Sequence, residues 1–117
     1  MMKAALTVAF CVVLGSFQVL NAQATQPDVP TLAQALDRCM ATYAVKLTKT
    51  DATDEAIYTA ATEGCKQIET DLVAAVRQDV PANQADAALQ QWSAQAKPNF
   101  MSLLQRIRTD RAARLAQ

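Results

Sequence analysis

Two cysteines on either side of a short polar segment constrain the fold of this chain more than any other feature of its sequence. Cys39 and Cys65 each lie 13 residues from position 52, which falls in the segment 49–53, rich in threonine and aspartate. When two antiparallel helices are joined by a short turn, residues at equal distances from the turn come together. The spacing therefore predicts a helical hairpin closed by a disulfide bond between Cys39 and Cys65.

Apolar residues recur on both sides of this turn with the periodicity of an α-helix. Before the turn, steps of four, four, three and four join Leu32, Leu36, Met40, Tyr43 and Leu47. After the turn, steps of four, four, three, four and four join Ile57, Ala61, Cys65, Ile68, Leu72 and Val76. We expect helices over about 32–48 and 54–79, with Cys39 beside the first apolar stripe and Cys65 within the second. Gly64 lies on the apolar side of the second helix, where it favours close approach of a neighbouring helix.

Residues typical of helix ends flank both predicted helices. Thr31 is expected to be the N-cap of the first helix, with Gln34 three residues later completing a capping box. Thr53 or Asp51 is expected to cap the second helix, and Pro81 to end it.

The rest of the chain also has helical spacing, interrupted by one proline. We expect a helix over about 83–96, capped by Asn83, and another over about 99–115, separated by a break at Pro98 or joined as one kinked helix. Strands are disfavoured, because runs of β-branched residues are scarce. The predicted fold is all-α: a small disulfide-stapled antiparallel helical hairpin plus one or two C-terminal helices.

The first 24 residues have the three parts of a secretory signal peptide. Lys3 supplies a positive charge, an apolar run follows over 4–20, and Ala22 and Ala24 occupy the −3 and −1 positions of a cleavage site. The alternative is an uncleaved membrane anchor, but the run is somewhat shorter than the roughly 20 apolar residues that span a bilayer.

Cleavage near Ala24 has consequences for the fold and for the compartment. It removes 24 of the 117 residues, leaving 93, and takes Cys11 away with the signal, so that only one pair of cysteines remains. We expect an extended leader over 25–30 and a single helical domain over 31–117. An exported protein, periplasmic or extracellular, meets the oxidising conditions in which a disulfide persists.

The composition argues against catalysis and against a bound cofactor. The chain has no histidine, and Gly64 is the only glycine after residue 24, so the commonest general base and glycine-rich phosphate loops are missing. Two cysteines alone are too few ligands for a zinc site, and their spacing is unlike the Cys-x-x-Cys of redox proteins. We expect a non-enzymatic protein without metal or cofactor, and no motif indicates a small-molecule site.

Positive charge is concentrated at the C-terminal end. Residues 25–96 contain ten acidic and five basic residues, a net of −5, whereas 97–117 contain five basic residues and one acidic, a net of +4. The arginines of the last predicted helix are Arg106, Arg108, Arg111 and Arg114. They fit either a solvated helix end that leans on the acidic hairpin or a site for an anionic partner. The leading hypothesis is an interaction protein of the cell envelope with an unknown protein partner; the alternative is a binder of anionic surfaces or nucleic acid through these arginines.

Overall fold

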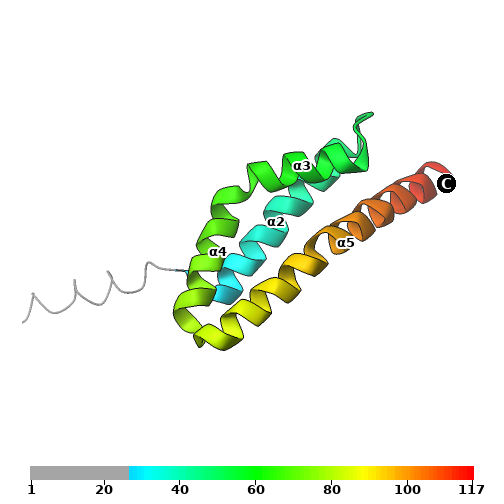
Figure 1. The fold of residues 1–117 in the computed structure, drawn as a ribbon. Helices are drawn as coiled ribbons and strands as arrows, with labels where there is room; N and C mark the ends of the chain where they lie inside the picture. Colours follow the sequence, from blue (N-terminus) through cyan, green and yellow to red (C-terminus); the bar gives the residue numbers. More distant parts are fainter. Residues whose placement is uncertain (1–26) are drawn as a thin grey trace, which may run out of the picture.

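The computed structural model describes residues 27–117, and every regular element in this range is an α-helix. The helices are α2 (Val29–Leu47), α3 (Asp54–Gly64), α4 (Lys66–Asp79) and α5 (Ala82–Leu115). The chain runs along α2, returns along α3 and α4, and turns back along α5, so that α2 and α5 point the same way (Figure 1). The predicted all-α fold with a helical hairpin is confirmed. The predicted signal peptide lies outside the described residues.

The first helix begins earlier than its sequence predicts. Asp28 is the N-cap, and its Oδ1 accepts a hydrogen bond from the backbone N–H of Thr31 at 3.0 Å. The predicted N-cap at Thr31 with a capping box to Gln34 is therefore wrong, and α2 includes the last two residues of the predicted leader. An aspartate caps as well as a threonine, and Pro30 is tolerated because backbone N–H groups of the first turn have no acceptor within the helix. Hydrogen bonding by Thr31, through its side chain and then its backbone, holds the pKa of Asp28 below its usual value.

Threonine side chains organise the turn between α2 and α3. The hydroxyl of Thr48 donates to the carbonyl of Ala44 at 2.8 Å, and that of Thr50 donates to Leu47 at 2.6 Å. Thr53 is the N-cap of α3, as predicted, and its hydroxyl accepts from the backbone N–H of Ala56 at 3.2 Å. The polar segment therefore forms the tight reversal that the hairpin requires.

The predicted disulfide bond is present. Cys39 on α2 and Cys65 at the junction of α3 and α4 are bonded, with their Cα atoms 6.0 Å apart. Cys65 is almost fully buried, with 1% of its surface exposed. The bond joins the two arms of the hairpin at mid-length.

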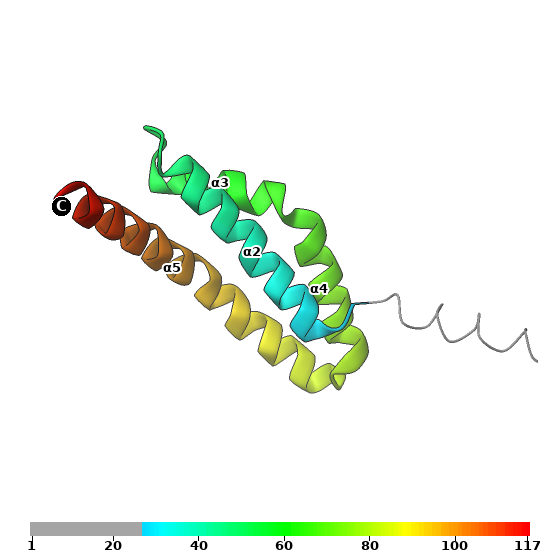
Figure 2. The same ribbon diagram turned by 180° about the vertical axis from the view of Figure 1, so that it is seen from behind.

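The second arm of the hairpin bends at Cys65, whereas its spacing predicts one continuous helix over 54–79. Cys65 has φ −104° and ψ 11°, outside the α-helical region, although its N–H still donates to Ala61 and its carbonyl still accepts from Glu69. Both ribbon views show α3 and α4 meeting at an angle (Figures 1 and 2). Apolar periodicity is preserved across such a one-residue bend, so the spacing alone gives no sign of it.

Gly64, just before the bend, lies against the ring of Tyr43 from α2. A Cβ atom at this position would overlap the phenol ring, lying 2.7 Å from Cε2 and closer still to Cζ and Oη. The prediction that Gly64 permits close approach of a neighbouring helix is confirmed. Because glycine is also a weak helix former, the same residue favours the interruption of the helix.

The C-terminal region is one helix rather than two, and it shows no sharp kink at Pro98 (Figures 1 and 2). α5 runs unbroken through Pro98, so the alternative of separate helices over 83–96 and 99–115 is wrong. The predicted cap at Asn83 is also wrong, because Pro81 is the N-cap and its carbonyl accepts from Ala85 at 2.8 Å. Pro98 is exposed, and Trp92 before it and Phe100 after it are held by packing. Packing on both sides of the proline outweighs the loss of one hydrogen bond within the helix.

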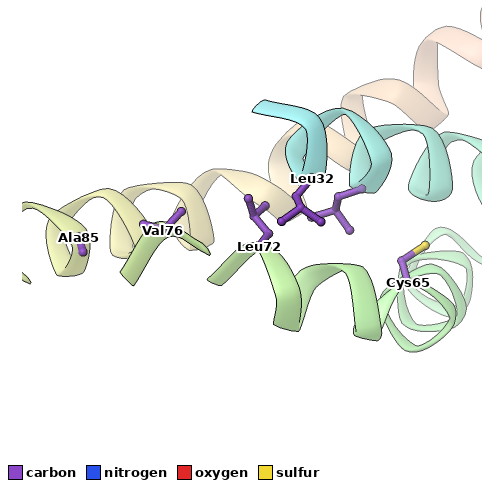
Figure 3. Close-up of a cluster of buried hydrophobic side chains, with 6 residues drawn as sticks. Leu32, Cys65, Leu72, Val76 and Ala85 are labelled. Atoms are coloured by element: carbon purple, nitrogen blue, oxygen red, sulfur yellow. The ribbon is translucent and has the colours of Figure 1, made fainter. Parts of the chain in front are cut away.

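The buried core is divided into two clusters. The first cluster comprises Leu32, Leu36, Cys65, Leu72, Val76 and Ala85. Its side chains come from α2, α4 and the start of α5, and Leu32 and Leu72 point toward each other (Figure 3). The second cluster comprises Ala44, Ile57, Ala61, Phe100 and Leu104. Met40 and Tyr43 of α2 pack against both clusters and connect them.

Candidate functional site

The structure separates the four C-terminal arginines rather than gathering them into one patch. Arg108 forms an ion pair with Asp54 at 2.7 Å, which ties α5 to the start of α3. Arg111 donates to the hydroxyl of Thr48 at 3.1 Å and to the carbonyl of Val45 at 3.4 Å. Two of the four arginines therefore hold the end of α5 against the hairpin.

The other two arginines lie apart from this contact. Arg106 is exposed and lines a cavity between the helices, and Arg114 is exposed in the last turn of α5. Neither forms an ion pair within residues 27–117. No single surface therefore contains all four residues.

Arg111 instead borders a basic surface on α2 that the sequence analysis did not single out. A shallow depression there is lined by Arg38, Ala41, Thr42, Val45, Lys46 and Lys49. We call Arg38, Lys46, Lys49 and Arg111 the basic face. Arg38 and Lys46 lie on α2, and Lys49 lies in the turn just after α2 ends; all three line the same depression. Val45, with 46% of its surface exposed, lies among them.

No ion pair within residues 27–117 neutralises the basic face, although Asp37 and Asp51 are its neighbours in the sequence. Residues 38–50 contain three cations and no acidic residue, and the ion pairs of the described chain involve none of the four cations. The hydrogen bonds of Arg111 to Thr48 and Val45 fix its guanidinium but leave its charge unbalanced. The sequence signal for this face is the excess of cations over 38–50, in the otherwise acidic region 25–96.

A second candidate site is an open cavity of about 490 Å³ between α2, α5 and the α3–α4 bend, which we call the central cavity. It lies where the core is divided: Leu36 of the first cluster and Phe100 of the second both line it. Thr62 and Glu69, which flank Cys65 on either side of the bend, also contribute. The two arms differ in shape here, because α5 continues as one helix while α3 and α4 meet at an angle (Figure 2).

Aromatic side chains form much of the cavity wall near α5. The ring centroids of Tyr58 and Phe100 are 5.4 Å apart and their planes are tilted by 56°. The ammonium group of Lys97 lies 5.6 Å from the centroid of Tyr58 and 2.9 Å from the carboxylate of Glu55. These contacts fix the wall on the α3 side. Trp92 lines the cavity about two helical turns before Phe100 on α5.

Neither candidate site has the features of a metal centre. In the range 27–117 there is no group of three or more histidine, cysteine, aspartate or glutamate residues placed to hold a metal ion. Helices long and apolar enough to cross a bilayer are likewise missing from this part of the chain.

Comparison with protein-family models, with curated proteins and with solved structures finds no match to this chain. Its function is therefore inferred from the geometry and charge of its own residues.

Proposed function

We propose that this protein is an exported, non-enzymatic interaction protein of the cell envelope that binds an acidic segment of a partner protein through its basic face. The single observation behind this proposal is the arrangement of Arg38, Lys46, Lys49 and Arg111 around Val45, with no carboxylate in an ion pair with any of them. An exposed apolar residue surrounded by cations suits an acidic amphipathic helix, whose apolar residues contact the centre while its carboxylates pair with the rim.

The compartment is consistent with this role. The Cys39–Cys65 disulfide suggests an oxidising compartment. Together with the predicted signal over 1–24, it supports export to the periplasm or beyond. The partner is accordingly sought among proteins of that compartment.

A charge-removal experiment tests the proposal. The triple variant Arg38→Gln, Lys46→Gln, Lys49→Gln removes three cations that make no ion pair, so the fold should be kept. Three exposed ion pairs at about 0.5 kcal/mol each amount to about 1.5 kcal/mol, which is roughly a tenfold loss of affinity. The probe is a synthetic helical peptide with alternating glutamate and leucine on one face, titrated by fluorescence anisotropy at low and high salt.

The matched control removes the same charge elsewhere. Lys66→Gln, Arg77→Gln, Lys97→Gln lowers the net charge equally but leaves the basic face intact, so its affinity for the peptide should stay within about twofold of the parent value. Equal weakening in both triple variants would show that only net charge matters and would refute the proposal. Tighter binding to phosphatidylglycerol vesicles or to duplex DNA than to the peptide would favour the alternative, a binder of anionic surfaces.

A further inference from the structure

The central cavity is a second site, distinct from the basic face, and its shape follows from small residues on α5. Between Trp92 and Phe100, the α5 residues that line the cavity are Ser93, Ala96 and Asn99. None of these three is large enough to fill the space between the two core clusters. The cavity volume of about 490 Å³ falls within the range of roughly 300–1,000 Å³ that is typical of small-molecule sites.

The cavity is long and has an apolar interior. Trp92 and Arg106, which line its two ends along α5, are 14 residues apart, which corresponds to about 21 Å along a helix. Between them lie Met40, Phe100 and Leu103, all of which contribute to the lining. An elongated space with an apolar middle section suits an unbranched hydrocarbon chain better than a compact ring system.

Charged residues at the cavity rim are separated by sign. Asp37 is next in the sequence to Leu36, a member of the first cluster, and Glu69 is next to Ile68, which packs against that cluster. The two acidic residues therefore line the part of the cavity beside the first cluster. Arg106, the only cation that lines the cavity, precedes Ile107, which packs against the second cluster. None of these three charged residues forms an ion pair within residues 27–117.

From this arrangement we propose that the central cavity binds a single-chain carboxylate amphiphile of the fatty-acid class. The carboxylate pairs with Arg106, and the hydrocarbon chain runs past Leu103, Phe100 and Met40 toward Trp92. The opposite orientation would bring the anionic head beside Asp37 and Glu69, and repulsion disfavours it. An apolar chain gains affinity mainly from burial, whereas its charged head selects the direction in which it enters.

The chain provides its own reporter for this site, since Trp92 is its only tryptophan. We would titrate the purified protein, residues 25–117, with octanoate, decanoate and dodecanoate below their micelle concentrations. Tryptophan fluorescence and isothermal calorimetry would follow binding in parallel. We expect saturable binding of one molecule per chain, with affinity rising about fourfold for each added methylene that becomes buried. Dodecanol and dodecylamine, which have the same chain length but a neutral or a positive head, serve as matched ligands.

Two kinds of variant locate the ligand. Arg106→Gln should weaken dodecanoate about tenfold and leave dodecanol unchanged, because only the charged head contacts that residue. Arg114→Gln removes an equal charge on the same helix outside the cavity and should change neither. Ala96→Leu places a larger side chain in the cavity and should weaken the binding of both ligands. Thr62→Leu fills the same cavity from α3 and replaces Ala96→Leu if that variant is thermally unstable.

The possible results discriminate clearly. Saturable binding that falls with cavity filling and prefers carboxylate in an Arg106-dependent way supports the proposal. Lack of saturable binding in both measurements, tighter binding of dodecylamine than of dodecanoate, or binding unaffected by both filling variants would overturn it. None of these results depends on the basic face, so this proposal and the proposed function fail separately.

Discussion

Breaking the Cys39–Cys65 bond should remove a large share of the stability of this protein. The bond closes a loop with a sequence separation of 26 residues. Loop-closure entropy in the unfolded chain then gives a stabilisation of about 3.5 kcal/mol. Small domains are stable by only about 5–15 kcal/mol in total, so the reduced protein should remain folded with little margin.

Urea denaturation followed by far-ultraviolet circular dichroism measures this effect. With a denaturant dependence near 1 kcal/mol per molar urea for a chain of this size, the unfolding midpoint should fall by about 3.5 M on reduction. The variant Cys39→Ala, Cys65→Ala should fall slightly further, because Cys65 is 1% exposed and its sulfur contacts the first cluster. Comparing the reduced parent with this variant separates the cross-link from the packing of the sulfur atom.

A control and a clear contrary result accompany this prediction. Thiol titration of residues 25–117, denatured but unreduced, should detect no free thiol. A free energy of unfolding that changes by less than about 1 kcal/mol on reduction would refute the view that the cross-link stabilises the hairpin mainly by constraining the unfolded chain.

Three smaller perturbations test local features of the fold. Gly64→Ala should destabilise the protein by roughly 1–2 kcal/mol, because the new Cβ overlaps the ring of Tyr43. In a Tyr43→Leu background the same substitution should be neutral or stabilising, because only helix propensity remains. Thermal melts of the parent, the two single variants and the double variant measure the coupling. Thr53→Ala should cost about 1 kcal/mol in urea denaturation, and an unchanged midpoint would show that the cap of α3 is dispensable. Folding lowers the pKa of Asp28, so its charged form stabilises α2 at pH values above the unfolded pKa of about 3.9, and this contribution is lost as the pH falls through the lower folded value. The free energy of unfolding of the parent should therefore exceed that of Asp28→Asn by less in acid than at neutral pH. A constant difference between pH 3 and pH 7 would contradict the assignment.

The hairpin was predictable because two independent patterns agree on it. The apolar stripes define two helices, and the positions of Cys39 and Cys65 relative to the turn define how the helices pair. Thr53 was also identifiable, because a hydroxyl residue followed by acidic residues is a strong helix start. Choices between neighbouring candidates were less reliable: Asp28 and Thr31 are both good N-caps, and only the backbone conformation decides between them.

The charges along the sequence indicate that the C-terminal end is basic, but they do not indicate which cations share a surface in the fold. Counting charges along the chain drew attention to the C-terminal arginines, yet Arg108 pairs with Asp54 and Arg111 reaches the end of α2. These contacts join residues more than 50 positions apart, which spacing within one helix does not reveal. Arg111 joins the cations of α2 and the following turn through its contact with Val45, a tertiary contact that the sequence does not reveal.

The central cavity could not be deduced from the sequence, because it depends on the difference between a bent arm and a straight helix. The apolar spacing across Cys65 fits one continuous helix, and a straight second arm would pack against α5 along its whole length. The bend instead turns α3 away from the line of α4, so α5 meets the first cluster through Ala85 and the second through Phe100. The space left at the level of the bend is lined by Thr62 and Glu69 on one side and by small α5 residues on the other. The sequence indicates that Gly64 allows close helix packing and that Cys65 forms a disulfide bond. Because the second arm bends at these two residues, they also determine where the central cavity lies.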